Sequence, residues 1–108
     1  MSPTWIRARI RYYAQLVGLG YVPTVVFSQK DWQRTVPARS HGDAHGSYGA
    51  SESSAGVVYV NLSRACCKRG TDDTCAHEVI HLRWENLRHG AKFDHYVSEM
   101  LLGRIPDA

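Results

Sequence analysis

Residues 74–84 read Thr-Cys-Ala-His-Glu-Val-Ile-His-Leu-Arg-Trp, and this stretch does most to decide the fold and the chemistry of the chain. It places His77 and His81 four positions apart, with Glu78 directly after the first histidine. Side chains four positions apart on a helix project from one face, so both imidazoles can reach a single metal ion. Imidazole nitrogens bind Zn²⁺ with bonds of about 2.0–2.1 Å. The stretch therefore predicts a zinc-binding helix.

Glu78 is expected to have a different task from the two histidines. It is offset from His77 by about 100° around the helix, so it is not expected to bind the ion. It is instead placed to hold a water molecule beside the metal and to accept its proton. We therefore predict that Glu78 is the catalytic base.

The third metal ligand has to come from further along the chain, because a catalytic zinc site takes three protein ligands and leaves one position open. We favour His89, since the Gly90 that follows it lets the chain turn back toward the helix. Glu99 stays open as the alternative, because it would lie on a following helix that could pack beneath the metal. The side chains considered for this position are Glu85, His89, Asp94, His95 and Glu99.

Residues 1–62 are expected to form one helix and several strands. Ser2 and Pro3 are typical of a helix start, and Gly18 of a helix end. The apolar runs that follow predict a strand over 21–28, a weaker one over 33–36, an exposed edge strand near 45–51 and an inner strand over 57–62. The last two would form a hairpin across residues 52–56.

The remaining residues predict two helices. The first covers about 72–87, with Thr71 and Asp72 as its cap and acidic first turn. The second covers about 91–102 and ends at Gly103. Together these elements give an α+β fold in one domain, residues 1–108. We expect a small, mainly antiparallel sheet of about three strands, packed on an N-terminal helix, an active-site helix and a C-terminal helix.

Composition narrows the function further. The net charge is +3 and the thirteen Lys and Arg residues are scattered, so binding of nucleic acid is permitted but unsupported. Three cysteines without a C-x-x-C pair disfavour both a disulfide framework and a cysteine-based zinc ribbon. No apolar run has the length of a signal peptide or a membrane span. We expect reduced thiols, no membrane and a place inside the cell, in the cytoplasm.

Several other polar residues have more than one interpretation. A donor to the developing oxyanion is expected, and Tyr48, Tyr96 and His95 are candidates by position. Asp94 or Glu85 could orient a ligand imidazole. A second metal site at His41, Asp43 and His45 is less favoured than an ordinary surface loop.

Residues 74–84, followed by His-Gly-Ala-Lys-Phe at 89–93, resemble the SprT-like and WLM-type metallopeptidases, which carry H-E-x-x-H and then H-G-x-x-F. Residues 46–49 and 57–62 are similar to the edge and inner strands of those families. The resemblance covers about 45–102. The 108 residues contain no Cys-rich zinc ribbon, so a role in repair of protein–DNA crosslinks is not supported.

The resemblance implies a minimal zincin fold and a zinc site of three histidines. It implies His77, His81 and His89 as ligands, Glu78 as base, and Phe93 as the residue that anchors the last helix.

We therefore expect a zinc-dependent metalloendopeptidase that cleaves an extended peptide or protein substrate added to the edge strand. Glu78 would activate a zinc-held water. The alternative is a metal-stabilised structural or binding module with little or no proteolytic activity. A third interpretation, a basic nucleic-acid-binding domain with an incidental motif, predicts no stoichiometric zinc. The sequence leaves the physiological substrate and the oligomeric state open.

Overall fold

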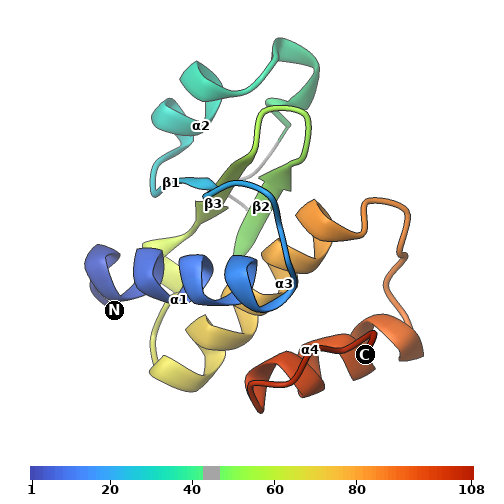
Figure 1. Ribbon diagram of the computed structural model, residues 1–108. Helices are drawn as coiled ribbons and strands as arrows, with labels where there is room; N and C mark the ends of the chain where they lie inside the picture. The colour runs from blue at the N-terminus through green and yellow to red at the C-terminus, as the bar shows by residue number, and fades with distance from the viewer. Residues whose placement is uncertain (43–46) are drawn as a thin grey trace.

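The computed structural model describes residues 1–42 and 47–108 (Figure 1). The predicted α+β class, with a three-stranded sheet, is confirmed. The elements follow one another as α1 (Pro3–Leu16), β1 (Thr24–Val26), α2 (Gln29–Thr35), the 3₁₀ turn η1 (Ala38–Ser40), β2 (Gly49–Glu52), β3 (Val57–Val60), the 3₁₀ turn η3 (Leu62–Arg64), α3 (Lys68–Arg83) and α4 (Ala91–Leu101).

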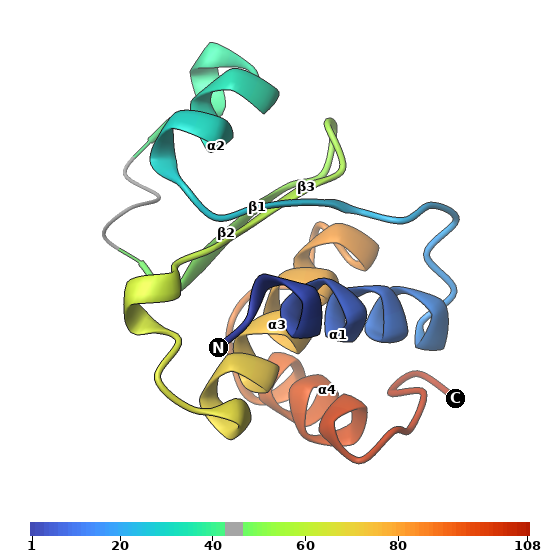
Figure 2. The same ribbon diagram turned by 90° about the vertical axis from the view of Figure 1, so that its left-hand side faces the viewer.

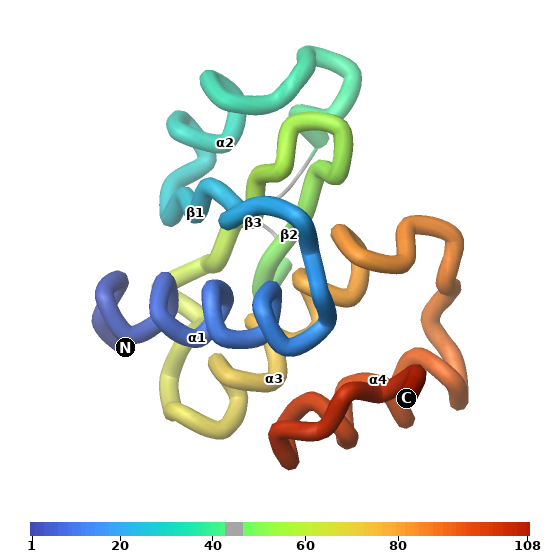
Figure 3. Tube along the Cα trace, viewed as in Figure 1, coloured from blue at the N-terminus to red at the C-terminus, as the bar shows by residue number. Residues whose placement is uncertain are grey.

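The sheet has the strand order β1-β3-β2, so β3 lies between two edge strands. β2 and β3 form the predicted antiparallel hairpin, in which Gly49 pairs with Val60. β1 pairs parallel with β3, with Val25 opposite Val58. The sheet is therefore mixed, and the expectation of a mainly antiparallel sheet holds only for the hairpin. Between β1 and β3 the chain runs through α2 and β2. β3 then lies beside β1 and runs in the same direction (Figure 3).

Helices cover both faces of the sheet, α2 on one side and α1, α3 and α4 on the other (Figure 2). The central strand is accordingly buried along its whole length. Val58 and Val60 belong to the larger core, together with apolar residues of α1, α3 and α4. Val57 and Tyr59 belong to a smaller core under α2. Alternate residues of β3 thus pack against different helix layers, as the pleat requires.

α1 forms as predicted. The hydroxyl of Ser2 accepts a hydrogen bond from the backbone N–H of Trp5 at 3.1 Å, and Pro3 occupies the first turn. Ile6, Ile10 and Tyr13 face the core along one side of the helix. The last turn is followed by Gly18, whose φ of 72° is the left-handed conformation that ends many helices.

The weak strand expected at 33–36 is wrong, because those residues end the helix α2. Ser28 caps this helix by accepting a hydrogen bond from the backbone N–H of Asp31 at 3.1 Å. The buried Trp32 then packs against Tyr59 of β3. A Ser three positions before an acidic residue is a start signal for a helix. That signal, together with burial of Trp32, outweighs the strand preference of Thr35 and Val36.

α3, which carries His77 and His81, begins at Lys68 rather than near residue 72. Its cap is Cys67, whose Sγ accepts from the backbone N–H of Gly70 at 3.4 Å, and not Thr71. Thr71 instead lies inside the helix with a buried side chain. The guanidinium of Arg9 ties α1 to this first part of α3 through two hydrogen bonds to Asp72, at 2.8 and 3.2 Å. The predicted start of the helix therefore lies one full turn after the observed start.

α4 agrees with the prediction to within a residue at its C-terminal end. Among residues 1–42 and 47–108, no helix combines the length and the apolar character that crossing a membrane would require. All three cysteines are free thiols, as expected. Cys75 is buried, whereas Cys66 and Cys67 are exposed.

Candidate metal centre

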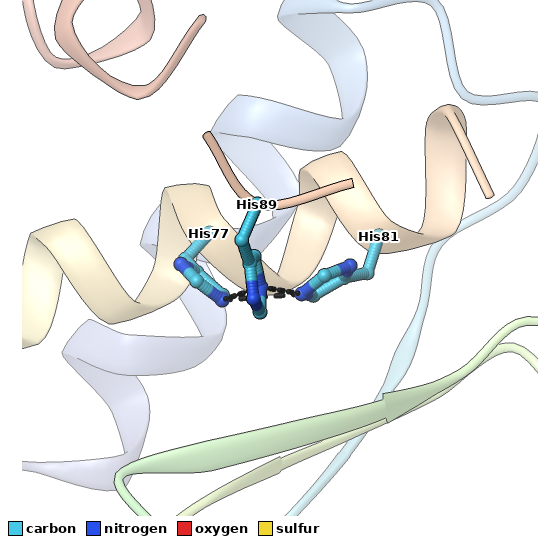
Figure 4. Close-up of side chains that lie close together, drawn as sticks. All are labelled: His77, His81 and His89. Atoms are coloured by element: carbon cyan, nitrogen blue, oxygen red, sulfur yellow. Dashed lines mark hydrogen bonds between the residues drawn. The ribbon is translucent and has the colours of Figure 1, made fainter. Parts of the chain in front are cut away.

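Three imidazoles converge on one point between α3 and the segment before α4 (Figure 4). The Nε2 atom of His77 lies 3.1 Å from that of His81 and 3.1 Å from that of His89. The Nε2 atoms of His81 and His89 lie 3.0 Å apart. The structure therefore brings together the three residues that the sequence suggested as metal ligands.

Hydrogen bonds alone cannot give all three Nε2 atoms of this cluster suitable partners. A neutral imidazole nitrogen is either a donor or an acceptor, and three Nε2 atoms face one another in pairs. Each of the three Nε2 atoms must be a donor or an acceptor, so at least two of them have the same role. Those two atoms then place lone pair against lone pair or N–H against N–H. A cation at the centre removes the conflict, because all three lone pairs then point at the same positive charge.

The spacing also suits the size of a metal ion. Tetrahedral zinc with bonds of about 2.0–2.1 Å holds its ligand nitrogens about 3.3–3.4 Å apart. The three nitrogens of this cluster lie 3.0–3.1 Å apart, a few tenths of an ångström closer. Three neutral imidazoles with an open fourth position are the donor set of catalytic rather than structural zinc. The residues present thus fit Zn²⁺.

Phe93 and Gly90 position the histidines from the α4 side. The ring of Phe93 is 1% exposed, and its centre lies 4.6 Å from the ring of His77, 5.0 Å from that of His81 and 4.8 Å from that of His89. Phe93 therefore anchors the start of α4 directly on the cluster. Gly90 has a φ of 155°, a conformation open almost only to glycine, and it turns the chain between His89 and α4.

The surroundings of His77 and His81 favour the neutral forms of these two imidazoles. Burial, followed by the neighbouring rings of His77 and His89, lowers the pKa of His81 to about 4. The pKa of His77 is also lowered, by burial and by His89, while the charge of Asp94 opposes this shift. Metal binding requires neutral imidazoles, so protons compete weakly for these two nitrogens around neutral pH.

Glu78 lies beside the cluster and faces the sheet. Its side chain is 4% exposed. Burial raises the pKa of this carboxyl group to about 7, and the Ser51 hydroxyl on β2 opposes the shift. A carboxylate with a pKa near neutral is suited to take a proton and later release it at that pH. Its environment matches the role of base predicted for it.

A cleft runs past the cluster along β2, with two connected hollows. Both hollows are lined by His77, Glu78, His89 and Gly49. The larger, about 740 Å³, extends toward Tyr48 and the first turns of α3. The smaller, about 400 Å³, extends toward Ser53 and the C-terminal end of α3. β2 is an edge strand, so within the described residues no other strand pairs with its outer side.

Glu99, the alternative third ligand, lies outside the histidine cluster. It sits near the end of α4, and its carboxylate accepts a hydrogen bond from Arg104 at 3.2 Å. Glu85 lies just beyond α3 and lines the smaller hollow. Asp94 is close enough to His77 to influence its pKa. His95 is exposed on α4 and neighbours Tyr96.

Of the three candidates for an oxyanion donor, Tyr48 alone lines the cleft. Tyr96 is buried against Trp84, at a distance of 4.8 Å between the ring centres. Of the residues in the less favoured second metal site, Asp43 and His45 lie outside the described residues. A ring nitrogen of His41 lies 3.3 Å from the carbonyl oxygen of Val36.

Gly49 is the residue of this site whose role the sequence interpretation missed. A Cβ built on it would lie 3.0 Å from Oε2 of Glu78 and 2.9 Å from the carbonyl oxygen of Tyr59. A glycine inside a strand can mark a close approach of another group. That signal was present in the sequence, but it does not say which group approaches.

Comparison of the chain with protein-family models, with curated proteins and with solved structures finds no match.

Proposed function

We propose that this protein is a zinc-dependent metalloendopeptidase of the SprT-like or WLM type. The observation that carries the proposal is the convergence of three imidazole Nε2 atoms, 3.0–3.1 Å apart, beside a buried carboxylate in an open cleft. His77, His81 and His89 would hold the ion through these nitrogens. When bound, the ion would supply Lewis-acid activation of a water molecule and of the substrate carbonyl.

Glu78 would move the proton. Its ionised carboxylate would take a proton from the attacking water as the new C–O bond forms. It would then give that proton to the leaving nitrogen as the C–N bond breaks. The raised pKa, about 7, supports both steps, since a base that is too weakly basic would not accept the proton and one too strongly basic would not return it.

β2 would hold the substrate. Its outer edge faces the cleft, and an extended polypeptide can add to such an edge through backbone hydrogen bonds. This mode of binding favours an unfolded or flexible segment over a folded surface.

The proposal is tested by metal analysis and by one substitution. Protein purified with zinc should contain one Zn²⁺ per chain. The Glu78→Gln variant should keep this zinc and the native fold but lose hydrolysis of an unfolded protein such as casein. Glu99→Gln, a matched change outside the cluster, should retain hydrolysis.

Absence of stoichiometric zinc would overturn the metal site and favour the nucleic-acid interpretation. Zinc-loaded native protein that behaves like Glu78→Gln on every peptide tried would instead favour the binding module.

A further inference from the structure

The two halves of the cleft have different chemistry. The half toward Ser53 is lined by Ala50, Ser51 and Glu85, so its side chains are small, hydroxylic or acidic. The half toward Tyr48 is nearly twice as large and has an aromatic ring on its wall. Both halves meet at His77 and Glu78, and a substrate lying along β2 would therefore contact both.

Tyr48 presents a large apolar surface at this end of the cleft. Its side chain is 61% exposed, among the most exposed large side chains in the described chain. The guanidinium carbon of Arg64 lies 5.3 Å from the centre of the ring, at a distance typical of a cation–π contact. At an exposed site such a contact favours the observed position of the ring by about 0.5–1 kcal/mol. Tyrosine is enriched at binding surfaces, because it combines a large ring with a polar hydroxyl group.

The rest of this half is compact and carries balanced charge. Gly49 and Gly70 line it with backbone alone, and Thr74 adds a small side chain. Arg69 and Asp73 carry opposite charges on the exposed first turns of α3. Outside the histidine cluster and Glu78, the lining therefore carries one positive and one negative charge. A hollow of about 740 Å³ falls within the range of about 300–1,000 Å³ found for ligand pockets.

We propose that this half of the cleft, the Tyr48 pocket, selects substrates with a large aromatic or aliphatic side chain close to the cleaved bond. The inference rests on the proposed function. An extended chain rises about 3.3 Å per residue, and alternate side chains point to the same face. A substrate paired with the four residues of β2 places one such side chain against Tyr48 while its backbone passes His77 and Glu78.

The test is a cleavage profile. Zinc-loaded protein is incubated with a mixture of unfolded peptides, and the new ends are identified by mass spectrometry. Phe, Tyr, Trp, Leu or Met should be enriched about tenfold or more at one fixed position within two residues of the cleaved bond. Tyr48→Ala should remove most of this enrichment. Tyr48→Phe should keep it, because the ring remains and only the hydroxyl is lost.

A binding measurement gives a readout besides activity. Calorimetry with zinc-loaded Glu78→Gln compares peptides that differ only at the selected position. The Phe peptide should bind about tenfold more tightly than the Gly, Asp or Lys peptide, and Tyr48→Ala in the same background should abolish that difference.

The outcomes separate the two proposals. If zinc-loaded protein cleaves nothing, the proposed function fails. If it cleaves without preference, or prefers an acidic or basic residue at that position, the enzyme stands and the Tyr48 pocket is refuted. The pocket is also refuted if Tyr48→Phe changes the profile as much as Tyr48→Ala, since selection would then depend on the hydroxyl.

Discussion

Gly49 and Glu78 are in close contact across the interface between β2 and α3. A Cβ at position 49 would lie 3.0 Å from Oε2 of Glu78, 3.0 Å from Cγ2 of Thr74 and 2.9 Å from the carbonyl oxygen of Tyr59. The φ angle of Gly49 is not positive, so the position requires glycine for space rather than for conformation. The missing side chain lets the edge strand lie directly on α3, and this close packing buries the carboxylate of Glu78.

Gly49→Ala should therefore both destabilise the fold and displace the base. Overpacking of this kind costs about 1–3 kcal/mol, because the backbone of Tyr59 has to move. Urea unfolding measures the free-energy change, and zinc content and hydrolysis are followed in parallel. We expect the variant to keep its zinc but to lose most of its hydrolysis.

Gly20→Ala is the matched control, because nothing lies within 4 Å of a Cβ there and its φ is not positive. It should leave the free energy of unfolding unchanged or raise it by up to about 1 kcal/mol, because alanine makes the unfolded chain less flexible than glycine does. Equal stability of the two variants would contradict the packing role of Gly49.

The histidine cluster could be predicted from the sequence because most of its geometry is local. The i, i+4 spacing of His77 and His81 on a helix is enough to align their rings. His89 required one further step, the recognition that Gly90 permits a turn. The contact between Gly49 and Glu78 joins residues from different elements, and only the folded chain shows which strand residue faces the carboxylate.

The same distinction explains the errors in the fold. The sequence places the start of α3 too late because the helix is capped by Cys67, an uncommon capping residue, and not by Thr71. α2 was missed because its residues near position 35 favour strands, whereas burial of Trp32 favours the helix. The parallel pairing of β1 with β3 depends on the path of the whole intervening chain, which patterns of neighbouring residues in the sequence do not indicate.

His89→Ala and Glu99→Ala should differ sharply in zinc affinity. Loss of His89 removes one of three converging nitrogens, and we expect zinc affinity to fall by about a hundredfold or more. Glu99 bonds to Arg104 outside the cluster, so its replacement should change zinc affinity less than about twofold. Competition with a chromophoric chelator measures both constants. A larger loss in Glu99→Ala than in His89→Ala would overturn the assignment of the third ligand.

Thiol labelling should divide the three cysteines into two classes. Cys75 is 0% exposed, and burial raises the pKa of its thiol to about 12. Cys66 and Cys67 are exposed. Because the thiolate is the reactive form, a thiol reagent at pH 8 should modify two thiols in the native protein and three in denaturant. Cys75→Ala should leave the native count at two. Rapid labelling of a third thiol in the native protein would contradict this burial.

Removal of the metal should make stability depend on the charge of Glu78. The folded-state pKa of this group, about 7, lies above the value of about 4.3 expected in the unfolded chain. The fold therefore favours the protonated form. Its stabilising contribution is fully present below about pH 4.3 and is lost as the pH rises through about 7. In chelator-treated protein, Glu78→Gln removes this pH dependence while keeping the shape of the side chain.

We therefore compare native protein and Glu78→Gln, both metal-free, by urea unfolding between pH 5 and pH 8. The two proteins share all their histidines, so the difference between their unfolding free energies reports mainly on Glu78. Relative to the variant, the native protein should lose roughly 2–3 kcal/mol over this range. Glu99→Gln, at a partly exposed carboxylate, should show no comparable trend. A constant difference between native protein and Glu78→Gln would show that this carboxylate is ionised in the fold throughout, and that burial does not tune it for proton transfer.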